Sequence, residues 1–148
     1  MYDLGKLQPY GIFVKGEIPS VFPPWGDRKQ WMVDHAFEYI CKRGYVVRVE
    51  DDFATDLASI PRWLRVFFGA NGREAVAAII HDNLYREQGK KRFNVLTKSS
   101  DRLNRQQCDE ILYDVMKLAG TGRIRRWFIY RGVRLGGWVA WKKNRKER

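Results

Sequence analysis

Cysteine and histidine are both scarce, with two of each among 148 residues. Cys41 and Cys108 lie far apart and show no CxxC or Cys/His zinc spacing, which excludes a disulfide framework and predicts a reducing compartment. No apolar run approaches the roughly 20 residues of a membrane-spanning helix. The first residues lack a basic segment followed by an apolar one, so we expect no signal peptide.

Acidic residues are nearly absent from the C-terminal end. The formal net charge is +11, and from Arg123 onward ten Lys and Arg residues accompany a single acid, Glu147. Such an asymmetry predicts attraction to phosphate, either in nucleic acid or in lipid headgroups. The charge alone does not choose between them.

The length fits one domain with its own core. We divide this single domain, 1–148, into a β-rich part (1–60), a helical part (61–120) and a basic, aromatic C-terminal segment (121–148). The expected fold is α+β: a small β-rich half, an antiparallel two-helix core and a basic amphipathic helix.

The β-rich part is predicted from β-branched and aromatic residues punctuated by glycine. Residues 19–26 contain three prolines and are expected to form a loop, whereas 34–42 fits either a helix or a strand. Residues 51–60 are expected to form a polar turn. Strands are predicted at 10–14, 31–33 and 45–49.

The later apolar residues recur at helical spacing. Pro61 suits the first turn of a short helix that ends at about residue 68. A second helix is predicted over 73–88. Either Ser99 or Ser100 would cap the third, which Gly120 would end. The segment 123–143 is amphipathic, and its glycines at 132, 136 and 137 predict a bend.

A candidate site centres on His81 and Asp82, inside the apolar run 78–85. His81 and Tyr85 are four residues apart and share a helix face, whereas Asp82 is rotated by about 100°. Antiparallel packing of the third helix could bring Asp109 to both. A carboxylate that accepts from an imidazole orients it as a base. Because no nucleophilic serine or cysteine is evident, we expect an activated water, with a hard cation at Asp82.

Simpler interpretations accompany each of these residues. A single helical histidine is usually structural, and Asp109 alone fits a solvated helix acid. Ser59 is expected to cap the helix near Pro61, since such turns favour Ser and Asp. The functional alternative places Asp56 and Ser59 at the mouth of the same cleft.

The run His81-Asp82-Asn83-Leu84-Tyr85 resembles the His-Asp-x-x-Tyr helix of phospholipases A2, and Cys108-Asp109-Glu110 resembles their second catalytic helix. The likeness covers roughly residues 69–118. It implies a phospholipase A2-like fold in which His81 is the general base and Asp109 orients it. It further implies that Tyr85 supports Asp109 and that Asp82 is a calcium ligand.

A second resemblance covers roughly residues 45–141. The run 53–61, then His81-Asp82-x-Leu84-Tyr85-Arg86, an acidic helix and an Arg/Trp-rich end are similar to a family encoded by phages and prophages. That family is catalogued as a domain of unknown function. The likeness implies a viral or prophage origin, with the protein in the virion or the host cytoplasm.

The C-terminal segment interleaves arginines with aromatic residues. It fits an interfacial helix on a phospholipid membrane or a nucleic-acid contact made by phosphate binding and stacking. A third interpretation has the aromatics in the core and the arginines solvated. The candidate phosphate or headgroup ligands are Arg125, Arg126, Arg131 and Arg134.

Three functions follow from these patterns. The leading hypothesis is a phage-encoded, phospholipase A2-like hydrolase that cleaves an ester at a membrane surface. The alternatives are a non-enzymatic virion or tail-assembly protein, whose partners are other virion proteins, and a nucleic-acid-binding accessory protein. Nothing in the sequence predicts an oligomeric state.

Overall fold

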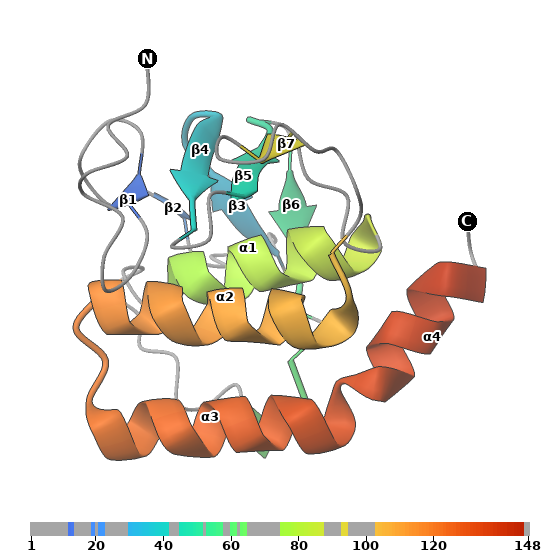
Figure 1. The fold of residues 1–148 in the computed structure, drawn as a ribbon. Helices are drawn as coiled ribbons and strands as arrows, with labels where there is room; N and C mark the ends of the chain where they lie inside the picture. The colour runs from blue at the N-terminus through green and yellow to red at the C-terminus, as the bar shows by residue number, and fades with distance from the viewer. Residues whose placement is uncertain are drawn as a thin grey trace.

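The β-branched and aromatic N-terminal residues form strands, and the later apolar periodicity forms helices, so the fold is α+β as expected (Figure 1). The strands in the computed structural model are β1 (Ile12–Phe13), β2 (Val21–Phe22), β3 (Trp31–Val33), β4 (Phe37–Ile40), β5 (Tyr45–Val49), β6 (Ala54–Thr55) and β7 (Phe93–Asn94). The helices are α1 (Ala75–Arg86), α2 (Arg105–Leu118), α3 (Arg123–Gly136) and α4 (Trp138–Lys146). The structure describes residues 12–13, 19, 21–22, 30–41, 45–51, 53–57, 60–61, 63–64, 75–87, 93–94 and 103–146.

The strands make two small antiparallel sheets, ordered β1-β4-β5-β7 and β2-β3-β6. In the central β4–β5 pair, Tyr39 lies opposite Val47 and both are buried, while their neighbours Glu38 and Arg48 form a half-buried pair. This alternation is what a half-buried strand requires. Within the segment 34–42, open to either interpretation in the sequence, residues 37–40 form a strand because they pair with β5.

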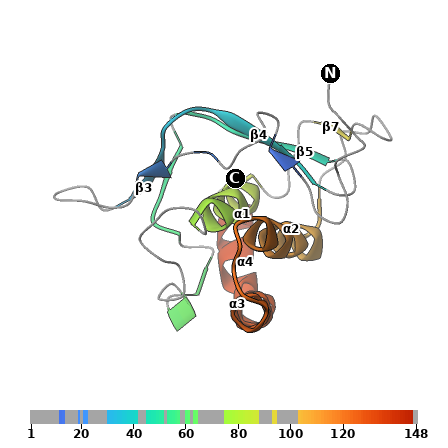
Figure 2. The ribbon, with the colours of Figure 1, turned by 90° about the vertical axis from the view of Figure 1, so that its left-hand side faces the viewer.

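The helices lie in layers under the sheets. Figure 2 shows α1 and α2 directly beneath the strands, and α3 below these two helices, farther from the strands. α1 and α2 run antiparallel, as predicted, and α3 reverses direction again. Nearly all of α1 is buried, because it packs against α2, α4 and β5. Within the described ranges, no helix is both long enough and apolar enough to cross a membrane.

Several boundaries differ from the predictions. Neither Ser99 nor Ser100 caps α2: the cap is Asn104, whose side chain accepts from the Gln107 N–H at 2.8 Å, while the Gln107 side chain accepts from the Asn104 N–H at 2.8 Å. This reciprocal capping box outcompetes an earlier start. Gly120 adopts a φ of +88°, consistent with its predicted role at the helix end.

Two predicted loops contain short strands. The loop at 19–26 includes β2, and the polar turn at 51–60 includes β6, because both segments pair with β3. Of the short helix predicted after Pro61, a single turn at 63–64 is present, and residues 65–72 lie outside the described ranges. Cys41 and Cys108 are buried, and neither forms a disulfide.

The predicted bend divides the C-terminal segment into α3 and α4 at Gly137. A Cβ at this position would lie 2.6 Å from the Val133 carbonyl oxygen and 2.8 Å from the Tyr85 hydroxyl. Glycine is therefore required by close approach and not by backbone conformation, since its φ of −68° is open to any residue. The bend places α4 beside α1, where Trp141 meets Tyr85.

We expect Gly137→Ala to lower the free energy of unfolding by about 1–3 kcal/mol, because the methyl group must displace backbone or the Tyr85 hydroxyl. Urea unfolding measures the change. The matched control is Gly122→Ala, where an added Cβ meets nothing within 4 Å and the expected effect is below about 0.5 kcal/mol. Equal effects of the two substitutions would contradict the close approach.

Candidate functional site

The candidate site is assembled where α1 and α2 pack side by side. His81 Nε2 lies 2.6 Å from Asp109 Oδ1, and neither side chain has any exposed surface. The contact predicted from the spacing of these residues is therefore present. Because Nε2 contacts the carboxylate, the imidazole ring is oriented with Nδ1 directed away from Asp109.

Tyr85, one turn after His81, donates its hydroxyl to the same oxygen of Asp109 at 2.6 Å. Its ring lies over the His81 ring, with centroids 4.1 Å apart, and Trp141 packs edge-on against it at 5.1 Å. Burial, reinforced by the charge of Asp109, raises the pKa of the Tyr85 hydroxyl above its usual value. Tyr85 therefore stays protonated and acts as a donor that holds the carboxylate.

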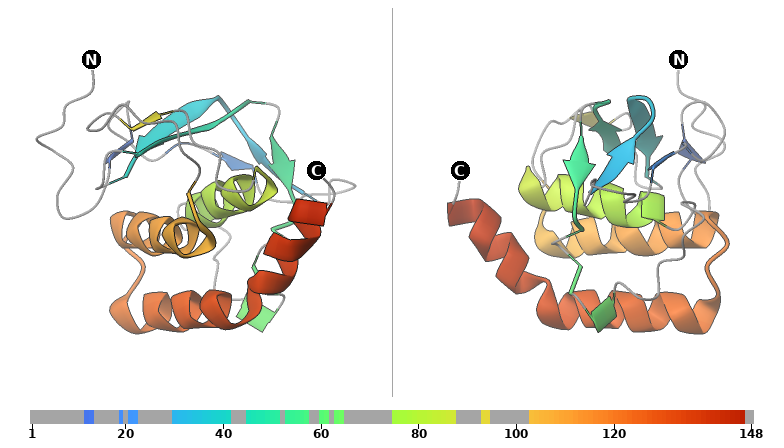
Figure 3. Two further views of the ribbon diagram at one scale, coloured as in Figure 1. Left: turned by 45° about the vertical axis from the view of Figure 1, so that its right-hand side comes forward. Right: turned by 180° about the vertical axis from the view of Figure 1, so that it is seen from behind.

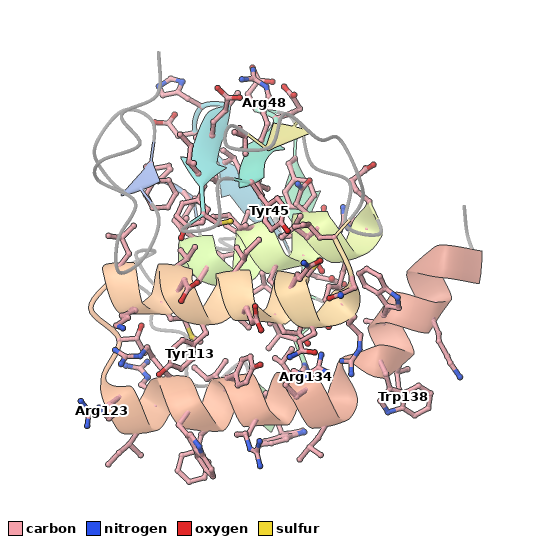
Figure 4. All side chains as sticks on the ribbon, viewed as in Figure 1. Tyr45, Arg48, Tyr113, Arg123, Arg134 and Trp138 are labelled. Carbon is pink, nitrogen blue, oxygen red and sulfur yellow. The ribbon has the colours of Figure 1, made fainter. Side chains whose placement is uncertain are left out.

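Two arginines hold the other oxygen of Asp109. Arg134 reaches from α3 and donates to Oδ2 at 2.7 Å (Figure 4), while Arg105 lies 3.5 Å from the same atom. Arg105 also donates to the carbonyl oxygens of Val133 and Arg134 at 3.4 and 3.2 Å. Arg134, expected from the sequence to bind phosphate or headgroups, is engaged in this structure by a buried carboxylate. Its guanidinium is drawn inward by the buried carboxylate.

The surroundings of Asp109 keep it ionised. Burial alone would raise the pKa of this carboxyl group, but hydrogen bonds from His81, Tyr85 and Arg134, together with the electrostatic attraction of His81, outweigh burial and lower it below its ordinary value. A carboxylate accepting this many charged or polar donors is stable in the core, where an unpaired one would be strongly destabilising.

Asp82 is buried, in a separate network on another side of α1. Thr55 donates its hydroxyl to Asp82 Oδ2, and Arg86 Nε lies 3.2 Å from the same oxygen. The Leu57 N–H in turn donates to the Thr55 hydroxyl at 2.9 Å, and Leu57 adopts a φ of +65°. The turn after β6 is thereby fastened to the middle of α1.

This donor set does not fit calcium, which takes six to eight oxygen ligands. Asp82 is accompanied by a hydroxyl and a guanidinium, and the described residues contain no group of three or more His, Cys, Asp or Glu side chains that could hold a metal. Calcium binding at Asp82 therefore stays a prediction without support from its described neighbours.

Sequence reasoning chose Asp56 and Ser59 from the turn at 51–60 and missed Thr55. Asp56 is exposed, and Ser59 lies outside the described residues. Thr55 and Leu57, on either side of Asp56, are buried. In an extended chain, successive side chains point to opposite sides, so a buried Leu57 predicts a buried Thr55 two residues earlier. This alternation is the sequence signal that could have identified Thr55. For Arg105, the signal was its i, i+4 spacing from Asp109 on the same helix, whereas its contacts with α1 and α3 have no counterpart in local spacing.

The three other arginines chosen from α3 differ in their exposure to solvent. Arg126 turns toward the protein, donating to the Thr121 carbonyl at 2.8 Å and lying 5.2 Å from the Tyr113 ring centroid. Arg125 is half-buried, and Arg131 is exposed beside Trp127. Of the four arginines chosen from the sequence, Arg131 is the one whose position is exposed.

A family model matches residues 31–133, which is most of the chain. The chain belongs to the family described as protein of unknown function, DUF1353. No curated protein and no solved structure matches it. The DUF1353 match begins and ends somewhat earlier than the expected 45–141, and it includes His81, Asp82, Tyr85 and Asp109. Arg134, which completes the contacts of Asp109, follows the last matched residue.

We expect Asp109→Asn to cost about 3–5 kcal/mol of unfolding free energy near neutral pH, because it removes the charge that pairs with His81 and Arg134. The folded-state pKa of Asp109 lies below its unfolded value of about 3.9, so its contribution is present above that pH and is lost as the pH falls. Denaturant unfolding at several pH values should show the difference from wild type narrowing in acid. The exposed substitution Asp51→Asn is the control, and a pH-independent difference for Asp109→Asn would contradict the assignment.

We expect Thr55→Val to lower the free energy of unfolding by about 1–3 kcal/mol, since Asp82 would lose a buried donor. Thr121→Val is a matched control: Thr121 is equally buried, yet its hydroxyl has no hydrogen-bond partner among the described residues, so this change should be neutral or stabilising. Thermal unfolding compares the two. A larger loss in Thr121→Val would refute the role given to Thr55.

Proposed function

We propose that this DUF1353 protein is a phospholipase A2-like hydrolase in which His81 is the general base that activates water for ester cleavage. The observation that carries the proposal is the trio His81, Tyr85 and Asp109. His81 Nε2 and the Tyr85 hydroxyl, both on α1, each lie 2.6 Å from Oδ1 of Asp109 on α2. The phospholipase A2 resemblance implies the same three roles.

In the proposed reaction, water attacks the ester carbonyl carbon and its proton passes to His81 Nδ1. Asp109, bonded to Nε2, stabilises the imidazolium that forms. When the tetrahedral intermediate collapses, the carbon–oxygen bond of the ester breaks and the leaving oxygen takes the proton. The products are an acid and an alcohol. Tyr85 and Arg134 would hold Asp109 in place, and no step is assigned to calcium.

Access to His81 is the requirement that decides the proposal. Its side chain has no exposed surface, so substrate would reach Nδ1 only after the covering side chains move. This observation favours a second candidate, a non-enzymatic virion or assembly protein in which the same network holds the helices in register. We infer a phage or prophage origin for either candidate from the ordered motifs, with the virion or host cytoplasm as its location.

The test is hydrolysis of phospholipid vesicles by the wild type and by His81→Gln, each with and without calcium. We expect fatty acid release that falls by about 10²-fold or more in His81→Gln, the usual contribution of a general base. His35→Gln is the control, since His35 is a surface histidine paired with Asp34. Circular dichroism establishes that each variant folds.

The outcomes separate the two candidates. Equal activity in wild type and His81→Gln would eliminate His81 as the base. Absence of hydrolysis by the folded wild type, together with stable association with purified virions, would support the non-enzymatic candidate. An activity that depends on calcium would restore the ligand role expected for Asp82.

A further inference from the structure

The outer face of the C-terminal helices exposes large apolar side chains. The α3 members recur at spacings of three, four and seven residues, which places them on one side of the helix. Ile124 and Leu135 expose 75% and 77% of their surface, which is unusual for aliphatic residues with a core available. We call this the α3–α4 outer face, and its apolar members are Ile124, Trp127, Phe128, Leu135, Trp138 and Val139.

The opposite face of α3 already packs against the protein. Ile129 and Val133 are fully buried, and Tyr130 meets Tyr113 of α2 edge-on at 5.7 Å. A Cβ on Gly132 would meet Leu64 at 2.5 Å, so the helix is also pressed against the turn at 63–64. Figure 3 shows α3 as the layer farthest from the sheets. The exposed apolar residues are therefore a second face that core packing does not use.

The two helices that form this face carry cations and no acids. The sequences of α3 and α4 contain no aspartate or glutamate. Arg131 lies 5.8 Å from the Trp127 ring centroid, and Lys142 lies 5.0 Å from that of Trp138. Arg123 marks one end of α3 and Trp138 the start of α4 (Figure 4). An open hollow of about 810 Å³ at the first turn of α3 is lined by Gly122, Arg123, Ile124, Arg125 and Phe128.

The combination of charge and aliphatic surface selects the partner. Nucleic acid would use the cations and the aromatic rings, but it offers nothing to Ile124, Leu135 or Val139. A second copy of the chain would bring like charges together. An anionic bilayer accommodates all three kinds of residue: aliphatics at the acyl boundary, tryptophans among the headgroups and cations on phosphates.

We propose that the α3–α4 outer face docks the protein on the surface of a bilayer that contains anionic phospholipid. The helices would lie in the interface plane, with their aliphatic side chains at the boundary between headgroups and acyl chains. This inference rests on the proposed function for its purpose, because it identifies the surface on which an ester hydrolase would meet its lipid. Binding is nevertheless measurable without hydrolysis.

The test is sedimentation with vesicles of phosphatidylcholine alone or mixed with phosphatidylglycerol, alongside a duplex DNA of random sequence. We expect binding to the mixed vesicles with a blue shift of tryptophan emission, and much weaker binding to phosphatidylcholine alone. Tighter binding to the duplex than to the mixed vesicles would overturn the proposal in favour of nucleic acid.

Two double variants address the two halves of the face. Ile124→Ser with Leu135→Ser should weaken vesicle binding on the order of a hundredfold, since two aliphatic side chains lose their burial. Arg131→Gln with Lys142→Gln should weaken it by roughly 25-fold, about fivefold for each cation. The matched controls are Met32→Ser, a partly exposed apolar residue on β3, and Lys117→Gln, an exposed cation on α2. Controls that lose as much binding as the double variants would overturn the assigned face.

Docking and hydrolysis fail in distinguishable ways. His81→Gln should keep full vesicle binding while losing hydrolysis. The Ile124→Ser, Leu135→Ser variant should keep its activity on a short-chain ester dissolved as monomers while losing activity on vesicles. If the wild type binds vesicles but hydrolyses no ester, the docking proposal is supported and the proposed enzymatic function is refuted. If vesicles are hydrolysed without any binding through α3 and α4, the enzymatic function is supported and the docking proposal is refuted.

Discussion

The buried carboxylate of Asp109 is the group on which the helical half of the protein depends. It sits on α2, accepts from His81 and Tyr85 of α1 on one oxygen, and accepts from Arg134 of α3 on the other. A charge without exposed surface is tolerated only when its donors are all in place. The packing of the three helices and the ionisation of Asp109 are therefore coupled, because loss of α1 or α3 would remove part of the donor set that stabilises the charge.

The same carboxylate connects the two proposals. α3 carries Arg134 on its inner side, where it contacts Asp109, and Trp127 and Leu135 on its outer side, where no core residue covers them. Arg105 adds a further connection through the carbonyls at the end of α3. The helix assigned to the bilayer is thus one of the elements that orient the His81–Asp109 pair. A smaller network, from Thr55 to Asp82, connects the β2-β3-β6 sheet to α1 in a comparable way.

Much of this arrangement is readable from spacing. Helical periodicity located α1, α2 and the bent C-terminal segment, and the four-residue interval between His81 and Tyr85 predicted their shared face. Boundaries were less predictable: Ser99 and Ser100 were chosen as caps, but Asn104 and Gln107 form the capping box. The strand β4 was undecided because Phe37 and Tyr39 fit two periodicities, and only pairing with β5 resolves them. Local patterns carry no information on which partner a segment meets.

The sequence by itself determined which residues share a helix face, where the positive charge gathers and which family the chain resembles, because these properties depend on neighbours within a few positions. Only the tertiary structure decided where each charge is neutralised. Arg134 looked like one of several phosphate-binding arginines, yet a carboxylate 25 residues away draws it inward. Asp82 looked like a metal ligand, yet Thr55 and Arg86 occupy its oxygen. Burial strengthens such pairings, and burial is set by the whole fold.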